Sequence, residues 1–211
     1  MYTPPAFRED DTTMLHALMR AARLCNFVTA TAEGLMATPL PLFLDEGEGE
    51  FGTLYGHLAR ANRQWQAPAL GEAMAIFMGP DAYVTPSWYA AKREHGKVVP
   101  TWNYVAVQAS GPVEFFDDPA RLREVVTRLT DLHERPRVEA WAVSDAPEAF
   151  VAAQLRGIVG LRMPVTRLMG KRKMSQNRSA EDRAGVAAGL RQGERASDHV
   201  VAELVAEEGG S

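Results

Sequence analysis

Extended segments joined by short turns dominate the chain between residues 26 and 116, and this pattern limits the fold more than any other feature. Residues 27–31 favour a strand, Glu33-Gly34 is a turn signal, and a second apolar run covers residues 35–44, so together they predict a hairpin. Further strands are expected at 53–58, 74–79, 82–89 and 100–116. Strands linked as hairpins favour an antiparallel sheet, and a chain of this length can form it into a closed or split barrel.

Turn residues refine this prediction. Pro39 and Pro41 cannot donate backbone hydrogen bonds, so their strand is expected at a sheet edge or with its N–H groups facing away from a partner. Gly79-Pro80-Asp81 is expected to separate two strands, and a last strand is expected from Leu161 to Met169. The total of about six or seven strands indicates an α+β, mostly β fold with helices inserted and appended.

Helical periodicity appears outside these strands. A first helix follows Asp10-Asp11, and another follows residues 117–119, where an aspartate can cap the helix and Pro119 suits the first turn. Polar residues 59–66 are expected to start a short helix, and a further helix follows Pro147. We expect one domain over residues 1–190 and a helical tail over residues 191–211 that ends in a frayed Gly-Gly-Ser.

Charge and cysteine content exclude several classes of protein. The 23 Lys and Arg residues against 27 Asp and Glu residues give a net charge of −4, so a broad basic face for nucleic acid is not expected. Cys25 is the one cysteine, which excludes an intrachain disulfide and a cysteine-based zinc site. We expect a reducing compartment, the cytoplasm, with neither an export signal nor a membrane span. No glycine-rich nucleotide motif is present.

Residues 56–62, Gly-His-Leu-Ala-Arg-Ala-Asn, form the first candidate site because a strand meets a helix start there. His57, Arg60 and Asn62 offer an imidazole, a guanidinium and an amide to an anion, and the forked guanidinium suits phosphate. A capped helix with solvated charges is the alternative interpretation. The other histidines form no metal-binding cluster, and lone histidines are more often surface or packing residues.

Three further segments combine chemically useful residues. Residues 85–89 (Thr-Pro-Ser-Trp-Tyr) and 100–104 (Pro-Thr-Trp-Asn-Tyr) could form the walls of a pocket for a flat ligand, or could belong to the core or an interface. Residues 171–179 place four positive charges before a helix that Ser179 can cap. That basic segment could bind phosphate or a ligand of another subunit, or it could be a solvated turn.

These segments, in this order, resemble the PaiB family of FMN-binding negative transcriptional regulators. The resemblance rests on residues 1–7, 37–45, 52–65, 77–89, 99–111, 158–165 and 170–182, and it extends to about residue 190. It implies a split β-barrel similar to that of pyridoxamine-phosphate oxidases and flavin reductases, which are homodimers with two FMN sites at the subunit interface. It also implies a regulatory role.

The resemblance also implies which residues bind FMN. By position, residues 56–62 would hold the phosphate, and the proline-containing strand would run along the isoalloxazine ring and offer backbone groups. The two tryptophan-bearing segments would shape the pocket, and the basic segment would reach the ligand from the same or the partner subunit. The implied residues are Thr38, Leu40, His57, Arg60, Asn62, Trp88, Trp102, Asn103, Gln176 and Arg178.

Three classes of function stay open at this point. The first is an FMN-binding regulator of the PaiB type that acts as a homodimer, and the second is a flavin-dependent oxidoreductase acting on a small substrate. The third is a haem-binding or haem-degrading relative, for which His57, His16 and His199 would be the first axial-ligand candidates. Direct contact with DNA is left open, although no DNA-reading helical motif is recognisable.

Overall fold

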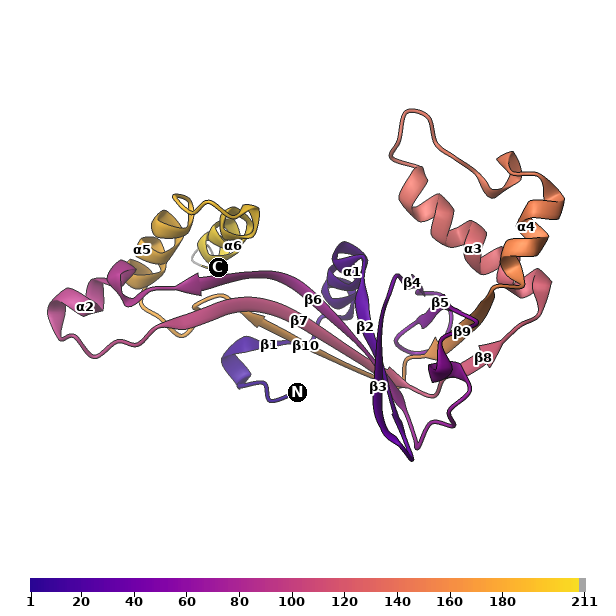
Figure 1. The fold of residues 1–211 in the computed structure, drawn as a ribbon. Coiled ribbons are helices and arrows are strands. Elements are labelled where there is room, and N and C mark those ends of the chain that lie inside the picture. The colour runs from indigo at the N-terminus through magenta and orange to yellow at the C-terminus, as the bar shows by residue number, and fades with distance from the viewer. Residues whose placement is uncertain (209–211) are drawn as a thin grey trace. The chain divides into compact units, whose positions relative to one another are not determined.

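The computed structural model describes residues 1–208, and the chain folds into two compact units (Figure 1). The first unit contains residues 1–11, 78–107 and those from 169 onwards, and the second contains residues 12–77 and 108–168. Strands β6 (Ala73–Val84), β7 (Thr101–Gly111) and β10 (Arg167–Lys173) each contribute residues to both units. The predicted fraying of residues 209–211 lies outside the described residues, and the predicted boundary at residue 190 stays a prediction.

The second unit combines a hairpin, a small sheet and three α-helices. Its elements are α1 (Thr12–Ala22), β2 (Cys25–Thr31), β3 (Gly34–Leu40), β4 (Phe43–Asp45), β5 (Thr53–Ala59), the 3-10 turn η2 (Arg63–Trp65), β8 (Glu114–Phe116), α3 (Pro119–Glu134), the 3-10 turn η4 (Val143–Asp145), α4 (Glu148–Leu155) and β9 (Ile158–Pro164). Four of these strands form an antiparallel sheet in the order β4-β5-β9-β8.

The predicted hairpin is confirmed as β2 and β3. Their antiparallel register places Thr31 opposite Gly34 and Cys25 opposite Leu40. The φ of Gly34 is +119°, a backbone conformation that glycine adopts far more readily than other residues. Strand β3 is the last strand of the six-stranded sheet, whose order is β1-β10-β7-β6-β2-β3. Pro39 therefore lies on an edge strand as predicted, where its missing N–H costs no hydrogen bond to a second neighbouring strand.

Helix α3 matches its sequence signals closely. The Asp118 carboxylate accepts a hydrogen bond of 2.9 Å from the backbone N–H of Arg121, and Pro119 occupies the first turn. The apolar stripe of α3 is buried in a cluster with residues of the small sheet. The members of this cluster that come from α3, β4 and β8 are Leu122, Val125, Leu129, Phe43 and Phe116.

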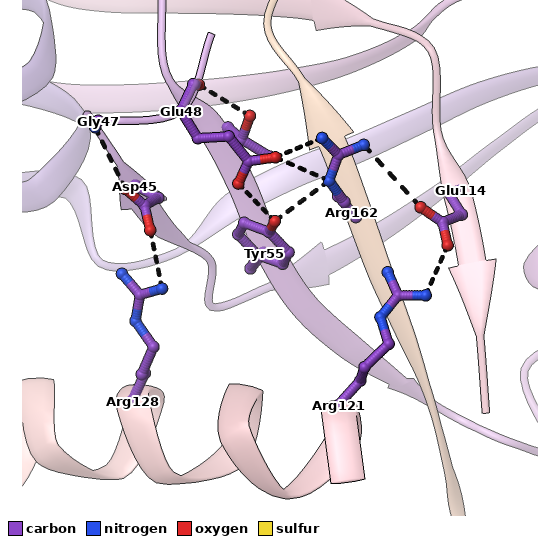
Figure 2. A network of polar contacts seen from close by, with 9 residues as sticks. Asp45, Gly47, Glu48, Tyr55, Glu114, Arg121, Arg128 and Arg162 are labelled. Atoms are coloured by element: carbon purple, nitrogen blue, oxygen red, sulfur yellow. Dashed lines mark hydrogen bonds and ion pairs between the residues drawn. The ribbon is translucent and has the colours of Figure 1, made fainter. Parts of the chain in front are cut away.

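Ion pairs also join α3 to the small sheet, as Figure 2 shows. On the sheet, Arg162 of β9 donates to Glu48 and to the hydroxyl of Tyr55 at 3.1 Å, and that hydroxyl donates to Glu48 at 2.6 Å. From α3, Arg121 binds Glu114 at 2.7 Å and Arg128 binds Asp45 at 2.8 Å. The hydrogen bonds from these partners hold the pKa values of the three carboxylates below their ordinary range.

The first unit carries both chain ends of the described structure. Besides its parts of β6, β7 and β10, its elements are η1 (Pro5–Phe7), β1 (Arg8–Glu9), η3 (Pro86–Trp88), α2 (Ala90–Glu94), α5 (Ala180–Leu190) and α6 (Ala196–Glu207). Helices α5 and α6 pack side by side (Figure 1). Ser179 caps α5 as predicted, because its hydroxyl accepts the backbone N–H of Asp182 at 3.2 Å. Among residues 1–208, no helix is both long and apolar enough to cross a membrane.

The predicted break at Gly79-Pro80-Asp81 is wrong, because β6 runs without interruption from Ala73 to Val84. The hydroxyl of Ser197 explains the difference, since it accepts the N–H of Asp81 at 2.9 Å and donates to the carbonyl of Asp81 at 2.6 Å. A residue 116 positions away thus satisfies the backbone groups that a local turn would otherwise leave to solvent.

The single strand predicted from Leu161 to Met169 is also wrong, because two strands, β9 and β10, share this segment. Hydrogen bonds from other segments of the chain hold the corner between β9 and β10. The N–H of Val165 donates to the carbonyl of Gly52, and the N–H of Thr166 donates to the carbonyl of Ser110, each at 2.9 Å.

Candidate functional site

Thr38 and Asn62, two of the predicted site residues, are hydrogen-bonded to each other in the second unit. The amide nitrogen of Asn62 donates to the hydroxyl of Thr38 at 2.9 Å, and that hydroxyl donates to the side-chain oxygen of Gln64 at 2.6 Å. Asn62 also caps η2, accepting the N–H of Gln64 at 2.9 Å. Thr38, Asn62 and Gln64 are called the amide cluster below.

Gln64 holds this cluster in place, and sequence reasoning missed it. Its side chain is wholly buried. Its amide nitrogen donates to the carbonyl of Phe27, the hydroxyl of Thr29 and the carbonyl of Met36 at 3.1–3.3 Å, so η2 is fastened to both strands of the hairpin. Its position two residues after the cap Asn62 is the signal that could have identified it.

Arg60 lies at the end of β5 and is fixed by backbone carbonyls. Its guanidinium donates to the carbonyls of Arg156 at 2.8 Å and Ile158 at 3.1 Å, and it lies 3.4 Å from the carboxylate of Asp117. None of these hydrogen bonds goes to the amide cluster. Its carbonyl accepts the indole N–H of Trp65 at 2.9 Å.

His57 and Leu40 occupy partly or fully buried positions in the second unit. Burial lowers the pKa of His57, and its Nδ1 is buried with no partner among the described residues. The ring lines a cavity of about 260 Å³ with residues of α3 that include Leu129 and His133. Leu40 is buried at the end of the edge strand β3, opposite Cys25.

Among the histidines considered as haem ligands, His16 is engaged and His199 is exposed. One ring nitrogen of His16 lies 3.1 Å from the carbonyl of Phe51, and the other lies 3.6 Å from Glu46. No group of three or more histidine, cysteine or acidic residues in the described part of the chain could hold a metal ion.

In the first unit, two motifs that lie far apart in the sequence meet. Asn103, from the Pro-Thr-Trp-Asn-Tyr motif, donates its amide to the hydroxyl of Ser175 at 3.0 Å, and both side chains are buried. Lys173 donates to the hydroxyl of Thr101 and to the carbonyl of Trp102, the latter at 2.8 Å. Ser175 has a φ of +64°, a conformation uncommon for a residue with a side chain, so this loop is held in a defined and costly shape.

The same segment presents three positive charges without carboxylate partners. Lys171, Lys173 and Arg178, called the cation cluster below, have no carboxylate within 4.0 Å in residues 1–208. Burial, followed by the charges of Lys171 and Arg178, lowers the pKa of Lys173. The intervening Arg172 is paired instead with Glu207 and Glu208 at the end of α6. Three neighbouring cations with no counter-charge favour binding of an anion.

Aromatic rings surround the cation cluster. The Lys171 ammonium lies 5.1 Å from the ring centre of Tyr104, and the Arg178 guanidinium lies 4.6 Å from that of Tyr89. The hydroxyl of Tyr89 is buried and has no hydrogen-bond partner among the described residues. Trp102 is half exposed and stands edge-on to Tyr83, with ring centres 5.9 Å apart.

Two of the predicted residues in this unit are occupied with local structure. Gln176 accepts the N–H of Met174 at 2.7 Å and donates to the carbonyl of Arg172 at 2.6 Å, so its amide shapes the loop. Trp88 packs against α5 so closely that a side chain at Gly185 or Gly189 would overlap it. Lys171, Lys173 and Tyr89 were not among the residues assigned to FMN, although the first two stood in the basic segment.

The chain matches a known family over most of its length. The family model described as "Putative FMN-binding domain" matches residues 1–167. An uncharacterized protein of Emericella nidulans is 31% identical over 246 aligned residues, which cover 99% of this chain and 98% of that protein. The protease synthase and sporulation protein PAI 2 of Bacillus subtilis is 29% identical, with 97% and 96% covered.

Solved structures support the fold. The flavocytochrome Anf3 from Azotobacter vinelandii has a TM-score of 0.56 and 15% identity, covering 79% of this chain and 69% of that one. The FAD and heme binding protein from Mycobacterium smegmatis has a TM-score of 0.55 and 14% identity, covering 86% and 80%. At this identity the likeness concerns the fold, which is the predicted split barrel of the α+β, mostly β class.

The donors in the first unit fit FMN. The cofactor carries a dianionic phosphate and a flat ring system, and the cation cluster offers unpaired positive charge beside aromatic rings and an unsatisfied hydroxyl at Tyr89. The particular residues that contact FMN stay a prediction. The match over residues 1–167 and the full-length relatives establish that the chain belongs to the FMN-binding domain family that includes the PaiB-type proteins.

Proposed function

We propose that this protein is an FMN-dependent regulator of the PaiB type that acts as a homodimer with FMN at the subunit interface. The observation that carries the proposal is the cation cluster, because Lys171, Lys173 and Arg178 lack carboxylate partners in the described structure. Neighbouring cations without a counter-charge repel one another and attract an anion, and the aromatic rings beside them suit a flat ligand. The FMN-binding domain match ends at residue 167, just before this cluster, and the cofactor of that family supplies a matching anion, its phosphate.

The phosphate is assigned to Lys173 and Arg178 in preference to Arg60. Lys173 is held by Thr101 and by the carbonyl of Trp102, and Arg178 is held against Tyr89, so both cations are positioned before a ligand arrives. Arg60, in contrast, lies 3.4 Å from the carboxylate of Asp117, which would repel a phosphate. When bound, FMN would supply the redox chemistry, and the protein would supply binding and orientation.

The homodimer is supported by the edge strand β3. Leu35, Ala37 and Pro39 alternate along the strand, so their side chains lie on one face, and all three are exposed. An exposed apolar face beside unpaired backbone groups favours contact with another chain. Thr38 and Leu40, which the resemblance implies as contacts of the flavin ring, stand on the same strand, and Asn62 donates to Thr38.

The first test is the visible spectrum of the purified protein, followed by mass spectrometry of the molecule released on denaturation. A flavin spectrum and the mass of FMN are expected. A Soret band would instead assign the protein to the haem-binding class. Loss of flavin absorption on addition of NAD(P)H without a transcriptional effect would favour the oxidoreductase class.

The second test measures FMN and riboflavin affinity of the apoprotein and its variants. Lys173→Met and Arg178→Met are each expected to weaken FMN binding about 10- to 150-fold, because a hydrogen bond to a charged group contributes about 1.5–3 kcal/mol. Riboflavin, which lacks the phosphate, is expected to bind these variants and the unaltered protein equally. Arg191→Met is the matched control, since Arg191 is paired with Glu203 on α6.

The same titration decides between the two phosphate assignments. Arg60→Gln is expected to bind FMN nearly as well as the unaltered protein. The opposite result would be unchanged FMN affinity in Lys173→Met and Arg178→Met with a large loss of affinity in Arg60→Gln. It would show that residues 56–62 bind the phosphate.

Regulation is tested separately from cofactor binding. Transcription is compared between cells with the protein, cells without it, and cells carrying Lys173→Met. If FMN controls the regulatory output, the variant is expected to reproduce the loss of the protein. Retarded migration of DNA that survives about 150 mM salt would show specific binding, because purely electrostatic contacts weaken steeply with salt.

A further inference from the structure

A cavity of about 500 Å³ lies in the second unit where the first turn of α3 meets α4 and the end of β5. Figure 1 shows α3 and α4 beside each other in this region. Leu122, Ala152 and Leu155 form an apolar part of its wall, and Leu122 and Leu155 are buried. The volume falls in the range of about 300–1,000 Å³ that is usual for small-molecule sites.

Three guanidinium groups line the same cavity. Arg60 is immobilised by the carbonyls of Arg156 and Ile158, and Arg123 is paired with Glu148. Arg156 has no carboxylate within 4.0 Å in residues 1–208. The cavity therefore has an apolar wall, fixed positive charge and one cation that no protein carboxylate neutralises.

The two carboxylates at the cavity are much more exposed than the cations they face. Asp117 is 71% exposed against 38% for Arg60, and Glu148 is 77% exposed against 37% for Arg123. Exposed ion pairs of this kind contribute little free energy, typically about 0–1 kcal/mol, so a ligand can replace the carboxylates.

We propose that this cavity binds a small organic carboxylate with an apolar body, such as a short fatty acid or an aromatic acid. A single carboxylate suits the excess of one positive charge over the two acidic residues, whereas the apolar wall suits a hydrocarbon chain or ring. The cavity shares no residue with the cation cluster or the amide cluster, but it shares Arg60 with the residues that the resemblance implies for FMN. The FMN titration of Arg60→Gln therefore distinguishes the two sites.

The test uses the full-length protein with its flavin and a panel of probes: butyrate, hexanoate, octanoate and benzoate, each with its neutral amide. Binding is measured by ligand-observed saturation-transfer NMR and by calorimetry. At least one acid is expected to bind, and its amide is expected to bind about tenfold more weakly because it lacks the charge. Absence of binding across the panel at millimolar concentration, or equal binding of acid and amide, would overturn the proposal.

Two variants with matched controls locate the site. Arg156→Gln is expected to weaken binding of the acid about tenfold, and Ala152→Phe is expected to abolish it by filling the cavity. Arg167→Gln, an exposed arginine paired with Glu72, and Ala153→Phe, the exposed neighbour on α4, are expected to leave binding unchanged. Flavin absorption is followed in every variant, so loss of FMN is distinguished from loss of the acid. Equal binding by Ala152→Phe and Ala153→Phe would exclude this cavity.

Discussion

The buried side chain of Gln64 allows a quantitative prediction for Gln64→Leu. Leucine has a similar volume but cannot form hydrogen bonds, so the substitution removes the polar partners of several groups without leaving a large cavity. The groups that lose a partner are the carbonyls of Phe27 and Met36 and the hydroxyls of Thr29 and Thr38.

The expected magnitude follows from the number of bonds. The two amide hydrogens of Gln64 serve three acceptors at 3.1–3.3 Å, and its oxygen accepts one strong bond of 2.6 Å from Thr38. This is equivalent to about three ordinary hydrogen bonds, each contributing about 1 kcal/mol net, and more where a buried group is left unsatisfied. The free energy of unfolding is therefore expected to fall by about 3 kcal/mol.

Equilibrium urea unfolding, monitored by tryptophan fluorescence, measures this change as a shift of the midpoint at constant m-value. Gln66→Leu is the matched control, since Gln66 lies two residues further on and is exposed, and its effect is expected to stay within about 0.5 kcal/mol. A loss of less than about 1 kcal/mol in Gln64→Leu would refute the reasoning, because η2 would then not depend on this side chain.

Three further predictions concern packing and ionisation. A side chain at Gly160 would overlap the ring of Phe116, so Gly160→Ala is expected to lower the free energy of unfolding in urea by about 1–3 kcal/mol. Adding Phe116→Leu should recover part of this loss, and a double variant whose loss equals the sum of the two single losses would contradict the overlap. Burial raises the pKa of Cys25 to about 12, so a thiol reagent at pH 8 is expected to react only as the protein unfolds, and rapid labelling of the native protein would contradict this. Hydrogen bonds from the Tyr55 hydroxyl and from Arg162 lower the pKa of Glu48, so they stabilise the folded protein above the ordinary glutamate pKa of about 4.3, and this stabilisation is lost as the pH falls below that value. Arg162→Met should therefore reduce the loss of folding stability between pH 7 and pH 3, and a loss equal to that of the unaltered protein would be evidence against this role of Arg162.

Local signals in the sequence predicted the first hairpin and helices α1, α3, α4 and α5 well, whereas α2 was missed and the helix expected over residues 59–66 is only the 3-10 turn η2. Asp118 and Ser179 each cap the helix that follows, and Gly34 supplies the turn, because capping and turn formation depend on a few neighbouring residues. The boundaries of the later strands were less accessible. The continuity of β6 at Asp81 depends on Ser197, a partner that no local pattern reveals.

The candidate site was predictable as a set of segments but not as a geometry. The residues of the basic segment look alike in sequence, yet the structure pairs Arg172 with acidic residues and leaves Lys171 and Lys173 without such partners among residues 1–208. Burial and partners far along the chain decide this difference. Likewise, Asn62 and Thr38 were both candidates, but their hydrogen bond depends on the hairpin that brings β3 beside η2.

Glu207 and Glu208, at the end of α6, neutralise Arg172, and so they set how many positive charges of the basic segment are left without a carboxylate partner in the described structure. Clipping or masking the last turn of α6 would release a further cation beside those already unpaired. Loss of that turn would therefore add Arg172 to the three cations without carboxylate partners in the described structure and strengthen their attraction for anions.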